Sequence, residues 1–376
     1  MNEPQIMIVD LGGQYTLLIA RRIRELGVRS VVLAPERVSE WVSSYAPKGI
    51  ILSGGWASIY DENAPRIPDI ILERAIPLLG ICLGMHWIAQ KLGGSVEPSV
   101  SRKEYGIRQF SRIENEDLLF ADVPAASAVL MSHGDSVTQL PHGARIIGET
   151  VRCPIAAFSI ADKKIWGIQF HPESSDSTDG MRMLQNFLLI CGAKEDWNPA
   201  GIVDEIRKEV ISALPPKAEV VHLFSGGVDS TVIAAILKPV LRDRLHRVTI
   251  NAGNFREDEL DEVSLNSYAA GCALTIIYAE EEFLAALAGL TDAEEKRLAF
   301  QRVYKETCEY IKTVFEIPYA IQGTLATDVI ESGKEGSAAF IKTHHNVGVK
   351  SLNPLHGLFK DEVREIARFL KLPESV

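Results

Sequence analysis

A cysteine between two glycines is the first feature of the sequence that could do chemistry. Cys82 lies in the stretch GICLGM, with Gly80 and Gly84 two residues away on either side. Small neighbours at this spacing let a nucleophile stand on a strained strand-to-helix turn. The positive end of the helix that follows favours a thiolate, and the backbone N–H of Leu83 can donate to an oxyanion. A buried structural cysteine beside turn glycines is the alternative interpretation.

A histidine and a carboxylate elsewhere in the sequence could serve this nucleophile. His171 ends the apolar stretch IWGIQF, Pro172 stiffens the turn after it, and Glu173 follows two residues on. Such a carboxylate can orient the imidazole and favour the imidazolium. A histidine by itself is more often structural. Its position at a strand end before a carboxylate, in the same domain as Cys82, favours a catalytic group.

A second candidate site lies in LFSGGVDSTV (223–232), between an expected strand and an expected helix. A glycine-rich loop at a helix N-terminus offers backbone N–H groups to phosphate. The loop lacks the G-K-[ST] of a Walker A motif. The carboxylate in the loop can hold Mg²⁺ or orient the loop, or it caps a glycine-rich turn. The candidate phosphate-binding residues are Ser225, Gly226, Gly227, Val228, Asp229 and Ser230.

Two later segments carry further polar candidates. In IQGTLATDVIES (321–332), Gly323 allows a nucleotide to approach the backbone closely. Asp328 and Glu331 are three residues apart, so on a helix they share one face, either as metal ligands or as a solvated acidic surface. In FIKTHHNVG (340–348), a lysine would stabilise phosphate charge as a point cation. The polar residues of this second segment are Lys342, His344 and His345.

Short apolar runs alternate with amphipathic stretches along the chain, and the elements that they form must position these groups. This alternation predicts α/β domains with mainly parallel sheets that are covered on both faces. A strand-rich region at 96–168 and a helix at 180–193 complete the first domain. A helix followed by Pro-Pro then indicates a linker, after which the strand–helix rhythm restarts. We expect two doubly wound domains, 1–195 and 205–376.

The composition limits the class of protein. The chain has 376 residues, 46% of them hydrophobic, with a net charge of −11. This charge argues against a general nucleic-acid or membrane-surface binder. The five cysteines are scattered without a C-x-x-C pair, which fits a reduced, cytoplasmic protein rather than a disulfide or zinc framework.

The motifs of the first half resemble class I glutamine amidotransferases, which have a flavodoxin-like fold. Four motifs carry this resemblance over about residues 5–193. They are GICLGM, GIQFHPE, the glycine pair of LSGGWAS and MSHGD (131–135). It implies that Cys82 attacks the amide of glutamine, that His171 protonates the departing ammonia and that Glu173 holds His171. It also implies oxyanion donors at Gly55 and Leu83 and glutamine-binding residues at His86, Ser132, His133 and Asp135.

The second half resembles the N-type ATP pyrophosphatases, with an adenine-nucleotide alpha-hydrolase-like fold. Five motifs that follow the first domain make the whole chain similar to the glutamine-hydrolysing GMP synthases. They are S-G-G-V-D-S, KRLAFQRVY, DVIES, IKTHHNVG and LFKDEVREIA. The resemblance implies that MgATP adenylates XMP and that ammonia displaces AMP to give GMP. The implied acceptor or phosphate contacts are Arg302, Lys342, His344, His345 and Lys360. The implied magnesium ligands are Asp229, Asp328 and Glu331, with Gly323 beside ATP.

Several positions depart from the pattern of that family. His86 stands where the family has glutamine, and Trp56 stands where it has proline. Asn251 and Ala252 replace the acidic strand end, and the chain ends before the family's C-terminal dimerisation domain. The alternatives are therefore the same chemistry on another acceptor, or a catalytically reduced regulator or partner subunit. We expect either a homodimer or a separate partner chain that supplies the missing domain. A tRNA-modifying pyrophosphatase is a third interpretation, which the acidic charge disfavours.

Overall fold

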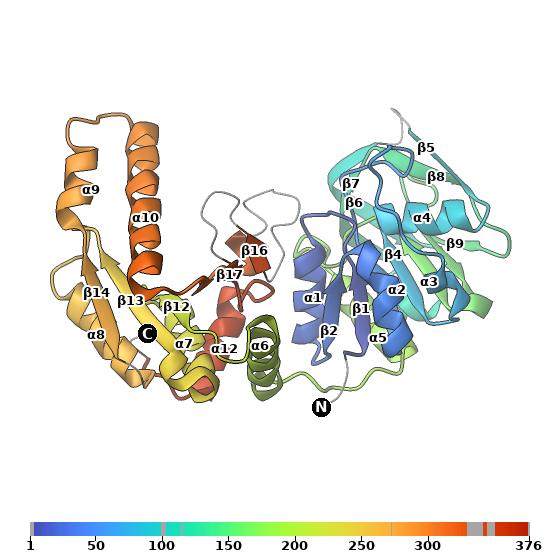
Figure 1. Cartoon of the computed structure of the whole chain (residues 1–376). Coiled ribbons are helices and arrows are strands. Elements are labelled where there is room, and N and C mark those ends of the chain that lie inside the picture. The colour runs from blue at the N-terminus through green and yellow to red at the C-terminus, as the bar shows by residue number, and fades with distance from the viewer. Residues whose placement is uncertain are drawn as a thin grey trace. The chain divides into compact units, whose positions relative to one another are not determined.

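The computed structural model describes residues 4–98, 103–113, 116–271, 273–328, 341–343 and 350–374. The chain divides into two compact units, Met1–Trp197 and Asn198–Val376 (Figure 1). Each unit has its own sheet and its own buried core. Among the described residues, no helix has both the length and the apolar character needed to cross a membrane.

The first unit is built on a nine-stranded sheet in which one half is parallel and the other antiparallel. The parallel half, in spatial order, is β2 (Ser30–Leu33), β1 (Ile6–Val9), β3 (Gly49–Leu52), β4 (Leu78–Ile81) and β11 (Ile165–Ile168). The antiparallel half continues with β10 (Ala157–Ile160), β9 (Arg145–Thr150), β6 (Glu104–Arg112) and β7 (Ala126–His133). A separate antiparallel pair consists of β5 (Ser95–Pro98) and β8 (Asp135–Gln139). The strand-rich region of the sequence thus extends the parallel sheet at one side.

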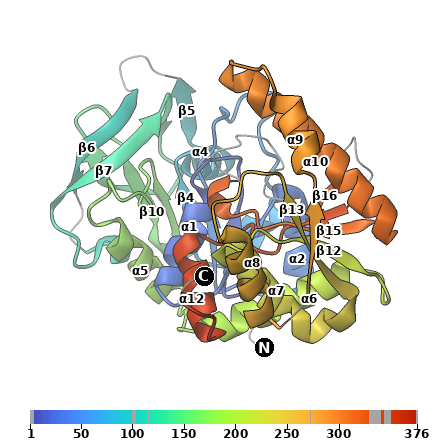
Figure 2. The same ribbon diagram turned by 90° about the vertical axis from the view of Figure 1, so that its left-hand side faces the viewer.

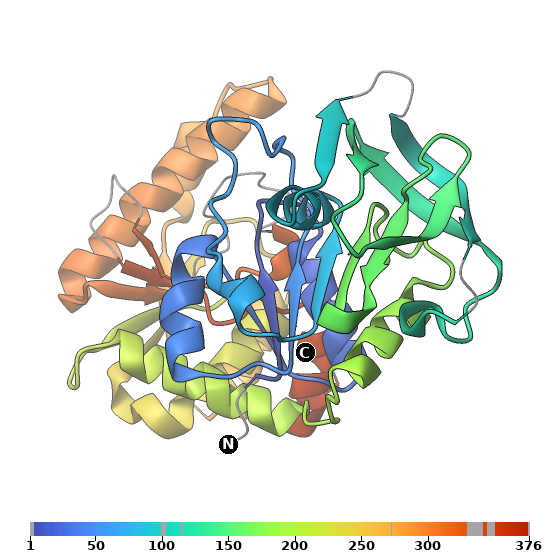
Figure 3. The same ribbon diagram turned by 90° about the vertical axis from the view of Figure 1, so that its right-hand side faces the viewer.

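The parallel strands are continuous apolar runs because helices cover both of their faces. β1, β3 and β4 are buried along their whole length. On one face, α1 (Thr16–Glu25) and α5 (Gly180–Ile190) pack into a single core with these strands. On the other face lie α2 (Pro35–Ser44), α3 (Ile70–Glu73) and α4 (Leu83–Lys91), and Figure 3 shows the side that carries α2 and α4. Short 3₁₀ turns occur at Leu118–Phe120 and Ala161–Lys163.

This topology gathers four loops at one edge of the first sheet. Strands β1, β3, β4 and β11 are parallel neighbours, so the residues after their carboxyl ends meet there. Those residues include the glycine pair after β3, Cys82 after β4 and His171 after β11. The sheet therefore places the first group of candidate residues together.

The second unit contains a six-stranded sheet. Its spatial order is β14 (Leu274–Tyr278), β13 (Leu245–Asn251), β12 (Val220–Leu223), β15 (Tyr319–Ile321), β17 (Lys350–Leu352) and β16 (Ile341–Thr343). Every pairing is parallel except that of β16 with β17. The order of the strands reverses at β12, and ligands of open α/β sheets bind at such a switch point. The glycine-rich loop follows β12 directly.

Helices cover both faces of this sheet as well. α7 (Val228–Leu241) and α8 (Glu259–Ala269) pack on one face, and α9 (Glu280–Leu287) and α10 (Ala293–Phe315) on the other (Figure 2). A 3₁₀ turn, Arg242–Arg244, follows α7. α6 (Pro199–Ala213) and α12 (Lys360–Phe369) contact α7 and each other. α6 therefore belongs to the second unit, whereas the sequence pattern indicates a linker there and places the domain start at 205, inside this helix.

A histidine in the middle of the second sheet is fully buried without a hydrogen-bond partner. Neither ring nitrogen of His222 has one among the described residues. Arg247 stands opposite it on β13. Burial, and then the positive charge of Arg247, lower the pKa of His222 to about 3. The imidazole is therefore neutral in the folded protein at any physiological pH.

We expect His222→Leu to stabilise the second unit, because it removes a buried polar group that has no partner; about 1–3 kcal/mol is typical. The folded-state pKa lies below the value of about 6.5 in the unfolded chain. Stability from the neutral ring is therefore present above that pH and lost as the pH falls toward 3. As the pH falls between these two pKa values, the free energy of unfolding of the wild type decreases by about 1.4 kcal/mol per pH unit relative to that of the variant.

Denaturant unfolding of the intact chain at pH 8 and at pH 5.5 measures this effect. His142→Asn, a change at an exposed loop histidine of the first unit, is the matched control and leaves the curve unchanged. A variant that is less stable than wild type, or that shows the same pH dependence, would contradict the assignment.

Candidate active site

Cys82 occupies a strained turn at the head of the first sheet. Its φ of 50° and ψ of −106° lie outside the regions that non-glycine residues normally adopt. Such strain costs about 1–3 kcal/mol and persists where the surrounding structure enforces it. A Cβ on Gly80 would lie 2.6 Å from the backbone of Gly84, and a Cβ on Gly84 would lie 2.6 Å from the side chain of Leu52. The flanking glycines are therefore required by close packing, and the thiol is held where β4 passes into α4.

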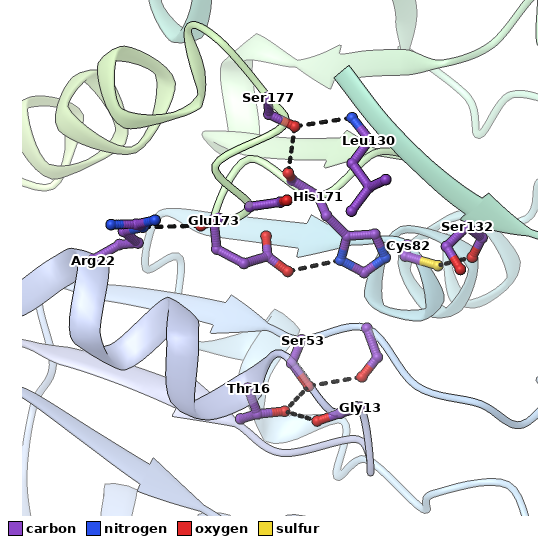
Figure 4. Close-up of polar contacts among 12 residues, drawn as sticks. Gly13, Thr16, Arg22, Ser53, Cys82, Leu130, Ser132, His171, Glu173 and Ser177 are labelled. Carbon is purple, nitrogen blue, oxygen red and sulfur yellow. Dashed lines mark hydrogen bonds and ion pairs between the residues drawn. The ribbon is translucent and has the colours of Figure 1, made fainter. Parts of the chain in front are cut away.

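His171 and Glu173 lie on the same side as this thiol. His171 Nδ1 is 2.7 Å from Glu173 Oε1, and both side chains are buried. Figure 4 shows the imidazole between the carboxylate and Cys82. Ser177 fixes this segment: its hydroxyl donates to the carbonyl of His171 at 2.6 Å and accepts from the N–H of Leu130 at 3.0 Å.

The charges of this group favour an imidazolium. Burial by itself would lower the pKa of His171. The negative charge of Glu173, and hydrogen bonds to Cys82 and Glu173, instead raise that pKa well above its ordinary value. Tyr15 packs edge-on against the ring, with centroids 5.2 Å apart. The arrangement is that of a cysteine nucleophile with a proton-carrying histidine oriented by a carboxylate.

The glycine pair after β3 contacts this group directly. A Cβ on Gly54 would lie 2.9 Å from Cε1 of His171 and 3.6 Å from Cβ of Cys82. Gly55 lies against the side chain of Leu83 and the carbonyl of Leu11. The two residues expected to form the oxyanion hole, Gly55 and Leu83, are thus in contact beside Cys82.

A buried serine that the sequence pattern did not single out holds the glycine pair in place. Ser53 Oγ accepts from the N–H of Leu11 at 3.0 Å and donates to the carbonyl of Gly54 at 2.9 Å. It also lies 3.0 Å from Thr16 Oγ1 (Figure 4). The carbonyl of Ser53 accepts from the N–H of Gly84 at 3.2 Å. The only sequence signal for this role of Ser53 is its position directly before the pair Gly54-Gly55.

The segment expected to bind glutamine lies beside the thiol. The carbonyl of Ser132 is 3.7 Å from Cys82 Sγ. His133 is buried, its Nδ1 lies 2.8 Å from the carbonyl of Asp135, and burial lowers its pKa. The carboxylate of Asp135 accepts a 2.6 Å hydrogen bond from Ser58. Ser132 is exposed and Asp135 is half-buried, so solvent reaches both residues.

His86 and Trp56, the two departures from the family pattern, have different environments. His86 is buried, and its Nε2 lies 2.8 Å from Oε1 of Gln169. Burial lowers the pKa of His86 to about 4, so the ring is neutral at pH 7. Trp56 is 66% exposed, and its indole Nε1 would lie 3.4 Å from a Cβ on Gly12, in the loop after β1.

The second candidate site is the loop between β12 and α7. Gly226 has a φ of +80°, and Gly227 caps α7 with φ −72° and ψ 168°. The hydroxyls of Ser225 and Ser230 are 3.2 Å apart, and Ser230 also donates to the carbonyl of Gly227 at 3.0 Å. The loop therefore has a fixed shape, with the first N–H groups of α7 behind it. It suits a phosphate group.

Asp229 connects this loop with two distant parts of the second unit. Its Oδ2 is 2.7 Å from Nζ of Lys360, the first residue of α12. Its Oδ1 is buried and has no hydrogen-bond partner among the described residues. A Cβ on Gly323, after β15, would lie 3.5 Å from Cβ of Asp229. A free carboxylate oxygen beside a phosphate loop fits Mg²⁺, which combines a few carboxylates with phosphate oxygens.

Of the other candidates of the second unit, Arg302 and Asp328 have described side chains, and both make contacts away from the loop residues Ser225–Ser230. Arg302 is exposed on α10, where it pairs with Glu306 at 3.2 Å. Asp328 accepts from the N–H of Leu325 at 2.8 Å, which caps a local turn. Lys342 lies on β16, and Glu331, His344 and His345 fall outside the described residues. Within the described ranges, no group of three or more His, Cys, Asp or Glu side chains is arranged to hold a metal ion.

Comparison with known proteins gives two family matches in this order along the chain. Residues 7–191 match the family described as glutamine amidotransferase class-I. Residues 202–302 match the family described as asparagine synthase. The first match contains Cys82, His171 and Glu173, and the second contains the loop from Ser225 to Ser230.

Relatives that match this chain over nearly its full length decide the family. A GMP synthase (glutamine-hydrolyzing) of Aquifex aeolicus is 41% identical over 385 residues, which cover 100% of this chain and 75% of that protein. The chain belongs to the glutamine-hydrolysing GMP synthase family. Another member, from Thermobifida fusca, is 39% identical over 389 residues, covering 99% of this chain and 73% of that protein. The crystal structure of a glutamine amidotransferase from Thermotoga maritima is similar over 56% of this chain and 87% of that one, at 22% identity and a TM-score of 0.39.

Proposed function

We propose that this member of the GMP synthase family is a glutamine-dependent ligase that converts XMP to GMP at the expense of ATP. The observation that carries the proposal is the arrangement of Cys82, His171 and Glu173 in a chain that also holds the Ser225–Ser230 loop. The first group releases ammonia from glutamine, and the second gives that ammonia an activated acceptor. The names of the relatives support XMP as the acceptor.

The first unit would hydrolyse glutamine through a thioester. Cys82 Sγ attacks the carboxamide carbon, and the backbone N–H groups of Gly55 and Leu83 stabilise the oxyanion. His171 gives its proton to the departing ammonia as the C–N bond breaks. His171 then takes a proton from water, which attacks the thioester and releases glutamate and the thiolate. Glu173 keeps the imidazole oriented and supports its positive charge in both steps.

The second unit would bind the phosphates of ATP at the N-terminus of α7. The loop supplies backbone N–H groups, and Lys360 brings a positive charge beside Asp229. Asp229 Oδ1 is the oxygen that would hold Mg²⁺, which would supply positive charge to offset that of the phosphates. The 2-oxygen of the xanthine ring attacks the α-phosphorus to form the adenylated acceptor. Ammonia then adds at that ring carbon and AMP leaves.

An assay of the intact purified chain tests this function. With glutamine, MgATP and XMP we expect AMP, pyrophosphate and GMP in equal amounts, and we expect ammonium chloride to replace glutamine. Formation of AMP only with some other nucleotide acceptor would overturn the XMP assignment. Glutaminase activity without any AMP formation would overturn the ligase assignment.

The second candidate function is the same synthase activity with weakened glutamine binding. The contact of His86 with Gln169 favours it. Glutamine at position 86 has an N–H group for Gln169 and keeps a carbonyl oxygen for the substrate. We expect His86→Gln to lower the KM for glutamine about five-fold, the effect of one added hydrogen bond, with kcat unchanged.

Steady-state GMP formation at varied glutamine concentration measures this change. The ammonia-supported rate is the internal control, since His86 lies only in the first unit. An unchanged or higher KM would show that histidine is itself the effective ligand at this position.

A further inference from the structure

The phosphate loop of the second unit lies at the start of α7. It also packs closely against a second helix, α8. A Cβ on Gly226 would lie 2.6 Å from Cγ2 and 3.0 Å from Cα of Val263, on α8. Gly226 also has a φ of +80°, which side-chain-bearing residues rarely adopt. Close approach to α8 and the backbone conformation therefore both require glycine here. The shape of the loop depends on where α8 lies.

A side chain of α8 fixes the direction of one peptide group in the loop. Asn266 Nδ2 donates to the carbonyl of Gly226 at 2.9 Å. In a planar trans peptide the carbonyl and the following N–H point in opposite directions. With the Gly226 carbonyl turned to α8, the N–H of Gly227 is directed away from α8. This N–H belongs to the nest of donors at the start of α7.

A buried arginine holds α8 itself. Arg247 is 1% exposed and donates to the carbonyl of Ser267 at 2.6 Å, to its hydroxyl at 2.9 Å and to the carbonyl of Ala270 at 3.1 Å. These groups lie at the C-terminal end of α8, where carbonyls lack helical partners and a cation is favourable. The guanidinium also lies 5.4 Å from the ring centre of Phe224, which leads into the loop. Arg247, on β13, thus connects α8 with Phe224, the residue that follows β12.

We propose that Asn266 is a positioning residue for ATP, which preorganises the phosphate loop through the Gly226 carbonyl while Arg247 anchors its helix. The inference rests on the proposed function in taking ATP as the ligand of this loop. It adds a residue outside the S-G-G-V-D-S motif. Without the Asn266 contact the Gly226 carbonyl keeps only its longer, 3.4 Å hydrogen bond from Thr231 Oγ1. The Gly226–Gly227 peptide is then less restrained, and ATP binding must restrict it.

Titration calorimetry of the intact chain with MgATP, without XMP or glutamine, tests the proposal. We expect Asn266→Ala and the isosteric Asn266→Asp, which lacks the N–H donor, to raise the Kd at least about five-fold, the value of one hydrogen bond. Ser264→Ala is the matched control: its hydroxyl donates to Leu260 within α8 and leaves the loop untouched. In GMP synthesis with ammonia, the KM for ATP rises in the two Asn266 variants while the KM for XMP stays constant. Thermal unfolding of all variants remains close to wild type.

The outcomes separate this inference from the function on which it rests. A Kd within about two-fold of wild type in both Asn266 variants overturns the positioning role. Equal weakening in Ser264→Ala also overturns it, because the effect would then belong to the helix in general. Wild-type protein that binds MgATP but forms no GMP overturns only the proposed function. Wild-type protein that binds no MgATP overturns both.

Discussion

Replacing Cys82 with alanine is expected to abolish GMP formation from glutamine and to leave GMP formation from ammonia intact. Removal of a nucleophile that acts together with a base lowers turnover by about 10⁴-fold or more. The second unit has its own core, so the loss is confined to the glutaminase. Parallel assays with glutamine and with ammonium chloride measure the two activities in one preparation.

Cys153→Ala provides the control for this prediction. Cys153 is another buried cysteine of the first unit and belongs to its hydrophobic core. Its replacement lowers stability modestly and preserves glutamine-supported activity. Substantial glutaminase activity in Cys82→Ala would place the nucleophile elsewhere. Loss of the ammonia-supported rate would show that the substitution acts on more than the glutaminase.

Asp229→Asn is expected to have the opposite selectivity, because it removes the carboxylate that we propose to serve the nucleotide. Synthesis from both nitrogen donors falls by about 10²–10³-fold, the scale of losing one electrostatic contact to a phosphoryl group. Lys360 also loses its charged partner. Glutaminase activity measured without XMP and ATP persists, since Asp229 lies in the second unit.

Production of AMP with ammonia as nitrogen donor checks this result, and Asp243→Asn is the control. Asp243 is a fully exposed carboxylate of the same unit, 3.7 Å from Lys238. Normal AMP formation in Asp229→Asn would remove this residue from the ATP site. A parallel fall in basal glutaminase would mean that the variant disturbs the whole chain.

Local patterns in the sequence predict the part of this site that is local in structure. Gly80 and Gly84 predict a tight turn, and Cys82 indeed has a positive φ. Glu173, two residues from His171, lies within hydrogen-bond distance of it. Two α/β units are present as expected. These features depend on residues that are neighbours in the chain, so spacing carries the information.

Contacts between distant residues could not be read in the same way. Asp229 and Lys360 are 131 positions apart, and His86 and Gln169 are 83 apart. Spacing says nothing of such pairs, since their distance is set by how the strands are ordered. The strand-rich region at 96–168 was expected, but its antiparallel pairing onto the first sheet was not, because alternation predicts a strand and does not select its partner. The exposure of Arg302 follows from which face of α10 packs on the sheet.

Trp56 can serve as an intrinsic fluorescent probe of the first unit because its side chain is exposed. Of the five tryptophans in the chain, Trp56 alone is exposed, and it follows Gly55 directly. Indole fluorescence shifts to longer wavelength in water, so the red edge of the emission spectrum comes mainly from this one residue. A soluble quencher such as iodide reaches it before the other four. Emission at that edge therefore reports events beside Cys82 without any attached label.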